Sequence, residues 1–292
     1  MRIAIYYDNI TGRNDGNPLY VWNALKRMQA ASDGKIEVDH LAPSPTAANH
    51  GTYDAHLWVD WGEDGLKPII PYKMIDCPRP SIYWASDTHL GYDYRLEMAK
   101  KFDHVFVAQK RAVEDFKRDG VEAEWLPHAF EPQAYPKLDL ASKRYDVGFV
   151  GHINSQNRID ALDRLFKEFP NFYYGQRLFE DAAEKFCESK IVFNISMLDD
   201  VNMRTFEAMG TGSFLLTNWI PTIEELFEDG KHLVLYRSLD EMVDKAKYYL
   251  AHDSERERIA AAGYDEVMQK HTIQHRVNRM LEVVDKKLLV GV

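Results

Sequence analysis

The sequence predicts an α/β protein made of two Rossmann-like domains that face each other across a cleft. Short apolar segments alternate with helix-like segments along most of the 292 residues, as in parallel sheets covered by helices. A polar stretch that contains Pro132 and Pro136 interrupts this alternation once. We therefore expect an N-terminal domain over residues 1–130, a linker over 131–144 and a C-terminal domain over 145–292.

The composition is that of an acidic globular protein in a reducing compartment. The formal net charge of −10 at pH 7 gives no general attraction to nucleic acids or anionic membranes. The two cysteines, Cys77 and Cys187, are too far apart in sequence for a metal or redox motif. The first residues read as a strand rather than a leader, and no apolar run approaches the roughly 20 residues that cross a bilayer. We expect a cytoplasmic protein.

Apolar segments typical of buried strands recur through the N-terminal half, at residues 3–7, 36–41, 55–60, 81–86, 103–108 and 122–126. Helix-like segments lie at 19–31, 94–101 and 110–118. The loop 11–18 contains two glycines but lacks the GxGxxG spacing, so a dinucleotide site is not expected there. That loop is either a ligand-facing segment or a simple connection.

Polar residues follow three of these strands, at the rim where a parallel sheet binds ligands. Asp8 and Asn9 end the first strand, and Asp60 ends the third. Asp87 and His89 follow the fourth strand, where a carboxylate and an imidazole can hold a hydroxyl and manage its proton. The alternative is that Asp87 caps the next helix and His89 is an ordinary loop residue.

The C-terminal half begins with a strand at 145–150 and a helix from Arg158 to Phe169. The turn between them contains Gly151 and His152, and the glycine lets a ligand approach the backbone. Arg158 opposes the helix dipole, a cost that a bound diphosphate explains better than packing does. Gly175 and Gln176 follow a strand at 171–174 and are expected to contact a base through backbone groups.

The most informative stretch is 190–238, which begins with a strand at 191–196. The loop after this strand leads Arg204, Thr205 and Glu207 into the first turn of a helix. The helix N-terminus and the guanidinium favour a phosphate. Glu207 suits a pair of ribose hydroxyls, and Asp199 is a second acceptor on the loop. Alternatively, Glu207 only offsets the helix dipole and Asp199 is a solvated acid. An anion site with two such carboxylates suits a nucleotide-sugar.

The last third of the chain is mainly helical. Pro221 and Thr222 begin a predicted helix with a capping box, and further helices are expected at 239–251 and 254–289, with breaks at Gly263 and Thr272. The final helix carries one apolar stripe and is expected to pack back across the domains.

Several of these residues resemble a known family. The spacing Asp199-x7-Glu207, the string Arg204-Thr205-Phe206-Glu207-Ala208, and the later Glu224-Glu225, Asp229-Gly230 and His232-Leu233 pairs resemble the donor half of GT-B glycosyltransferases. The similarity is closest to the group related to the spore-coat CgeB proteins and more distant to the retaining family GT4. That family has Glu-x7-Glu, so Asp199 is a departure. Arg158 fits its diphosphate-binding basic residues, whereas His152 replaces an arginine.

The resemblance implies transfer of a sugar from a nucleotide-diphosphate-sugar, UDP- or GDP-linked, to a hydroxyl acceptor of unknown identity. It implies a metal-independent and retaining reaction, and the chain contains no DxD motif. No cofactor or metal is expected. The N-terminal domain is expected to serve the acceptor, with Asp87 or His89 as general base if the enzyme inverts instead.

Three other functions remain open from the sequence. They are a nucleotide-sugar epimerase of the same fold, a non-catalytic carbohydrate-binding protein, and a viral-type DNA-base glycosyltransferase. The net negative charge argues against the last.

Overall fold

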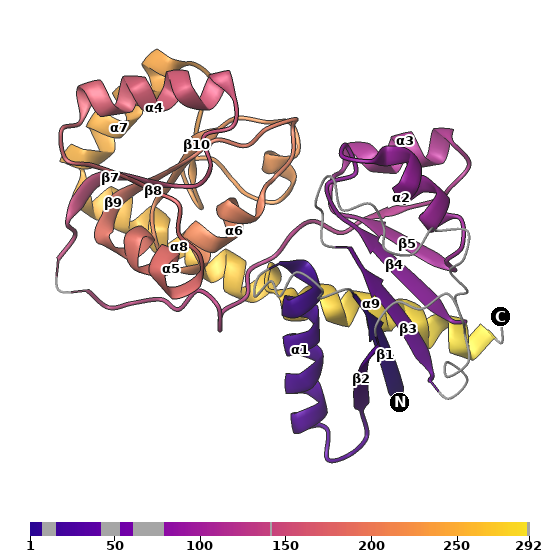
Figure 1. Cartoon of the computed structure of the whole chain (residues 1–292). Coiled ribbons are helices and arrows are strands. Elements are labelled where there is room, and N and C mark those ends of the chain that lie inside the picture. Colours follow the sequence, from indigo (N-terminus) through magenta and orange to yellow (C-terminus); the bar gives the residue numbers. More distant parts are fainter. Residues whose placement is uncertain (8–15, 42–52, 61–78, 141, 291–292) are drawn as a thin grey trace. The chain divides into compact units, whose positions relative to one another are not determined.

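The computed structural model describes residues 1–7, 16–41, 53–60, 79–140 and 142–290. The chain forms two compact units (Figure 1): the first combines Met1–Pro127 with Ile273–Val292, and the second is His128–Thr272. The chain therefore passes from one unit to the other twice. The sequence predicts a donor domain plus terminal helices over 145–292, with the last helix crossing back, and in the structure that helix is part of the first unit.

A six-stranded parallel sheet forms the centre of the first unit, in the order β2-β1-β3-β4-β5-β6. Its strands are β1 (Arg2–Tyr6), β2 (Glu37–Leu41), β3 (Ala55–Val59), β4 (Ser81–Ala85), β5 (His104–Val107) and β6 (Glu124–Trp125). Its helices are α1 (Asn17–Ala31), α2 (Tyr92–Ala99), α3 (Arg111–Arg118) and α9 (Ile273–Val290). All five residues of β4 are buried, as expected of an apolar strand covered on both faces.

Helix α9 is fixed to the first unit by two arginines. The Nε of Arg276 donates to the carbonyl of Pro127 at 2.8 Å, and burial lowers the pKa of Arg276 to about 10. Arg279 donates to both carboxylate oxygens of Glu124, at 2.8 and 2.7 Å. Helix α9 also packs against α1. These contacts explain why the last helix belongs with the first strands of the chain.

A five-stranded parallel sheet forms the second unit, in the order β11-β10-β9-β7-β8. Its strands are β7 (Tyr145–Val150), β8 (Phe172–Gly175), β9 (Ser189–Asn194), β10 (Leu215–Asn218) and β11 (Val234–Tyr236). Its helices are α4 (Gln156–Glu168), α5 (Phe179–Glu188), α6 (Met203–Gly210), α7 (Leu239–Ala251) and α8 (Asp253–Lys270). In Figure 1, α4 and α7 lie on one side of this sheet and α5, α6 and α8 on the other.

Two local predictions for the second unit are wrong. Only a 3₁₀ turn, Ile223–Glu225, follows Pro221, because the hydroxyl of Thr222 donates to the carbonyl of Asp199 instead of capping a helix. Helix α8 also runs through Gly263 without a break. A Cβ at this position would lie 2.2 Å from the main-chain oxygen of His232, so the glycine permits close packing rather than ending the helix.

Among the described residues, no helix combines the length and the apolar composition that crossing a membrane requires.

Candidate functional site

A buried network of polar side chains holds the N-terminus of α6. The side-chain nitrogen Nδ2 of Asn194, the last residue of β9, lies 3.2 Å from Asn202 Oδ1, 3.4 Å from Thr205 Oγ1 and 3.2 Å from Thr217 Oγ1. Asn202 in turn accepts a hydrogen bond from the main-chain N–H of Thr205 at 3.2 Å, which makes it the helix cap. The predicted donor-site residue Thr205 is fully buried in this network, so its side chain serves the helix position.

Replacing Asn202 with alanine is expected to weaken this helix N-terminus. The change removes the cap and leaves the amide of Asn194 without one of its partners, and loss of such a cap costs about 1–2 kcal/mol. Hydrogen exchange of the α6 amides measures the effect. Asn157→Ala, at an exposed position of α4, is the control and should leave α6 unchanged. Equal protection of α6 in both variants would contradict the capping role.

Arg204 and Glu207 lie together on α6. Arg204 Nη1 is 2.6 Å from Glu207 Oε2, and the glutamate is only 4% exposed. The guanidinium also lies 5.2 Å above the ring of Phe186. The partner of Glu207 in the structure is therefore Arg204, and its predicted contact with a ribose stays a prediction.

Arg158 connects the loops that follow β7 and β9. Its Nη1 donates to the carbonyl of His152 and to Asn154 Oδ1, both at 2.9 Å, and its Nη2 donates to the carbonyl of Ile195 at 3.1 Å. Within the described part of the chain, nothing accepts from its buried Nε. Burial and the positive charge of Arg204 lower the pKa of Arg158. The charge of Arg204 thus acts on Arg158 at the carboxyl edge of the second sheet, where a bound anion would interact favourably with both guanidinium groups.

The two predicted glycine turns meet at neighbouring strand ends. The main-chain N–H of Gly151 donates to the carbonyl of Gly175 at 3.0 Å. A Cβ at Gly151 would lie 3.1 Å from the ring of Phe149, and one at Gly175 would lie 2.4 Å from the hydroxyl of Tyr173. Aromatic neighbours therefore account for both glycines. His152 and Gln176, the residues that follow them, are exposed.

The loop that carries Asp199 has an unusual backbone. Leu198 and Asp199 have φ values of 55° and 54°, which residues with a Cβ rarely adopt. The hydroxyl of Thr222 fixes this turn by donating to the carbonyl of Asp199 at 3.0 Å. The Asp199 side chain is exposed. Strained backbone is typical of functional loops, and here it presents a carboxylate to solvent.

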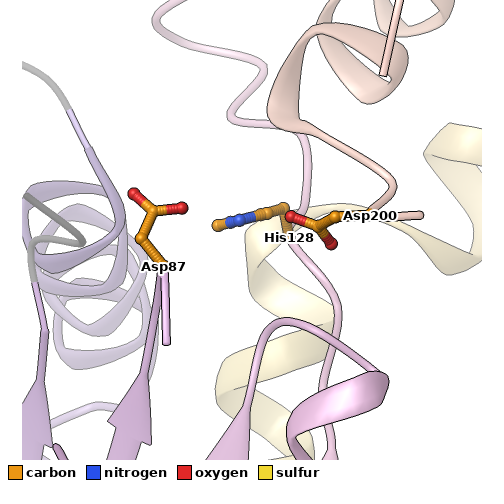
Figure 2. A group of neighbouring side chains, drawn as sticks. All are labelled: Asp87, His128 and Asp200. Atoms are coloured by element: carbon orange, nitrogen blue, oxygen red, sulfur yellow. The ribbon is translucent and has the colours of Figure 1, made fainter. Parts of the chain in front are cut away.

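Sequence reasoning missed that His128 and Asp200 lie near each other. Both belong to the second unit, and a ring nitrogen of the buried His128 lies within 4.8 Å of a carboxylate oxygen of Asp200 (Figure 2). From the sequence alone, His128 is expected to be a hinge residue in a packed turn, with a position in the cleft as the alternative, and Asp200 has no assigned role. No local signal could reveal this pair, because the two residues come from opposite ends of the unit's first half.

In the first unit, Asp60 is held by a buried arginine. Its Oδ2 lies 2.6 Å from Arg95 Nε and accepts a hydrogen bond from the hydroxyl of Tyr83 at 3.2 Å. Arg95 is 4% exposed. Burial alone lowers the pKa of Arg95, but Asp60 and neighbouring groups raise it above its usual value. Asp60 therefore has a structural role that the sequence analysis did not foresee.

The other first-unit candidates are placed as follows. Asp87 is half-buried with a φ of 45°, and its carbonyl accepts from the N–H of Leu90 at 2.8 Å. Gly91, rather than Asp87, is the N-cap of α2. His89 is exposed. Asp8 and Asn9 lie outside the described residues.

Comparisons with known proteins agree with this architecture. A protein-family model described as "Glycosyl transferase-like" matches residues 139–282. A comparison with curated protein sequences finds no match. Sucrose-phosphate synthase from Thermosynechococcus elongatus is a similar solved structure, with a TM-score of 0.65, 12% identity and coverage of 100% of both chains. HepE from Anabaena in complex with UDP and glucose has a TM-score of 0.65, 14% identity and coverage of 98% of this chain and 100% of that one.

A third similar structure is AviGT4, described as a glycosyltransferase involved in avilamycin A biosynthesis. Its TM-score is 0.61 at 14% identity, with coverage of 100% of this chain and 98% of that one. At these identities the likeness establishes the fold, which is the GT-B fold of two Rossmann-like domains. Most of the glycosyl transferase-like match lies in the second unit.

Proposed function

We propose that this enzyme moves a sugar from a nucleotide-diphosphate-sugar to a hydroxyl group of an acceptor. Most of its second unit matches a family model described as glycosyl transferase-like. In this reaction the nucleoside diphosphate leaves, and negative charge develops on its outer phosphate. Positive groups already in place around that phosphate lower the barrier, because they need no rearrangement during the reaction.

The juxtaposition of Arg158 and Arg204 carries this proposal. Both side chains are partly or largely removed from water, and burial together with the charge of Arg204 lowers the pKa of Arg158. Glu207 pairs with Arg204, whereas the acceptors of Arg158 described above are neutral oxygens. A bound diphosphate would attract both guanidinium groups, with the N-terminus of α6 adding its amide groups.

The remaining donor-site roles follow from the same placement. We propose that Gly151, His152, Gly175 and Gln176 line the nucleotide and that Asp199 faces the transferred sugar. Glu207 holds Arg204 through Oε2 and would accept from the ribose through its other oxygen. The two guanidinium groups supply the positive charge that a divalent cation supplies in other transferases, so we propose a metal-independent reaction. Retention of configuration rests on the resemblance to GT4 alone.

The first unit would serve the acceptor. Asp87 and His89 are the proposed contacts for its hydroxyl, and Asp8 and Asn9 keep the acceptor-side role that the sequence predicts. Asp60 is a weaker candidate, because Arg95 and Tyr83 engage its carboxylate. We propose a cytoplasmic enzyme, since the two distant cysteines suit a reducing compartment. The CgeB-like assignment rests on the sequence resemblance described above.

Alanine at Arg158 or Arg204 is expected to weaken binding of UDP about 10- to 100-fold, because a hydrogen bond to a charged group contributes about 1.5–3 kcal/mol. UDP is a suitable first probe, since HepE was solved with it. Isothermal titration calorimetry measures the change. Arg164→Ala is a matched control on α4, because Arg164 contacts Glu168 and Asp240 at the surface instead. If the variant lacking both Arg158 and Arg204 binds UDP like the wild type, the anion site is misplaced.

Product analysis with UDP-glucose separates the alternatives. A transferase releases UDP and slowly hydrolyses the donor when no acceptor is present, whereas an epimerase interconverts donor sugars and releases no UDP. A binding protein does neither.

A further inference from the structure

The hydroxyl of Ser196 is one of several buried polar groups in the described part of the second unit that have no hydrogen-bond partner. Ser196 is 5% exposed, and within the described residues its Oγ has neither donor nor acceptor nearby. Its main-chain groups are both satisfied by Asn218, which accepts from the N–H at 2.7 Å and donates to the carbonyl at 3.2 Å. Leaving a buried hydroxyl unpaired costs about 1–3 kcal/mol, so its presence needs a reason.

Its position suggests that reason. Ser196 directly follows Ile195, whose carbonyl accepts from Arg158. It also begins the loop that leads to Asn202, the cap of α6. The hydroxyl thus lies on the segment that runs from the carbonyl held by Arg158 to the helix that bears Arg204.

A second unpaired donor follows the neighbouring strand. The buried indole Nε1 of Trp219 has no acceptor among the residues that the structure describes. Trp219 follows Asn218, whose side chain bonds to the backbone of Ser196. In the sheet Thr217 is paired with Asn194, and Trp219 and Ser196 each lie two residues after a member of this pair. Ser196 and Trp219 therefore follow adjacent strands at the same level of the sheet. Two donors without protein acceptors at one rim indicate a ligand rich in oxygen atoms.

The order of the strands indicates which part of the donor these groups meet. Along the rim, β8 carries the turn proposed for the base, β7 and β9 carry the loops that Arg158 connects, and β10 precedes Trp219. Asp199, proposed to face the sugar, has its main-chain carbonyl held by the hydroxyl of Thr222, which follows Trp219 closely in the chain. The sequence of groups along the rim is therefore base, phosphates, sugar.

From this arrangement we infer that the Ser196 hydroxyl and the Trp219 N–H are kept for the sugar-bearing end of the donor. Ser196 donates to an oxygen of the phosphate that carries the sugar, and Trp219 donates to an oxygen of the sugar. The inference rests on the proposed function and adds two specificity-determining residues to it.

The test compares UDP-glucose with UMP, which has neither the outer phosphate nor the sugar. Ser196→Ala and Trp219→Phe are each expected to weaken UDP-glucose binding about five- to tenfold, the loss of one good hydrogen bond, and to leave UMP binding unchanged. Calorimetry with the full-length protein measures both ligands. Ser196→Ala should also keep or raise the Tm, because the hydroxyl that it removes has no partner.

Ser213→Ala is the matched control. Ser213 is equally buried, but its hydroxyl pairs with Thr211 at 3.1 Å, so this variant should lose Tm and keep its affinity for UDP-glucose. Unchanged affinity of both Ser196→Ala and Trp219→Phe for UDP-glucose would overturn the inference and assign the two donors to buried water. Equal loss of UMP and UDP-glucose would also overturn it. A wild-type protein that binds neither these ligands nor their GDP-linked counterparts would instead refute the proposed function itself.

Discussion

Replacing Asp60 with asparagine is expected to lower the free energy of unfolding of the first unit by about 3–5 kcal/mol. The change removes the carboxylate that lies 2.6 Å from the nearly fully buried guanidinium of Arg95. Breaking a buried ion pair by removing one partner is costly, because the remaining charge keeps the penalty of having left water. The hydroxyl of Tyr83 would lose a charged acceptor as well.

Urea denaturation followed by hydrogen exchange in β3 and β4 measures this loss. Asp119→Asn is the control, because Asp119 pairs with Arg118 and Tyr92 at the exposed end of α3 and should matter much less. Combining Asp60→Asn with Arg95→Met should restore part of the stability. A variant at Asp60 that stays stable but loses activity would favour the acceptor-side role expected from the sequence.

Alanine at Gly263 is expected to destabilise the second unit by at least about 3 kcal/mol, the upper range for overpacking a core. Two effects compete at this position. Alanine favours a helix over glycine by about 1 kcal/mol, but its Cβ would lie 2.2 Å from the carbonyl oxygen of His232. That contact is with main chain, which cannot turn aside as a side chain can, so the steric effect dominates.

The sign of the change makes this test decisive. Ala261→Gly, at an exposed position of the same helix, isolates the helix propensity and should cost about 1 kcal/mol. Thermal unfolding of both variants, with circular dichroism as the readout, gives the comparison. A more stable Gly263→Ala protein would show that α8 and the segment at His232 are not in close contact.

The sequence predicted the architecture because strands buried on both faces leave a strong signal. Ser81–Ala85 and Ser189–Asn194 are nearly continuous runs of buried residues in the structure. The errors came where distant parts of the chain decide the local structure. The hydroxyl of Thr222 bonds to the loop of Asp199 instead of capping a helix. Gly263 allows α8 to pack closely against the main chain of His232.

Only those site residues that have a recognisable local sequence pattern could be predicted. Arg158 and Arg204 each occupy the start of a helix after a strand, which is visible in the sequence, and the structure places them close enough to affect each other. Their role with a diphosphate stays a prediction. The contacts of Asn194 and Asp60 were not foreseen, because each depends on residues from other elements.

The double crossing of the chain between the two units has a consequence for its synthesis. Residues 128–272 leave the ribosome before residue 273, so every element of the second unit exists before α9 does. The first unit must wait for α9, which supplies the partners of α1, Pro127 and Glu124. We therefore expect the usual order of folding, N-terminal part first, to be reversed in this chain. The strands that are translated first therefore belong to the unit that is completed last.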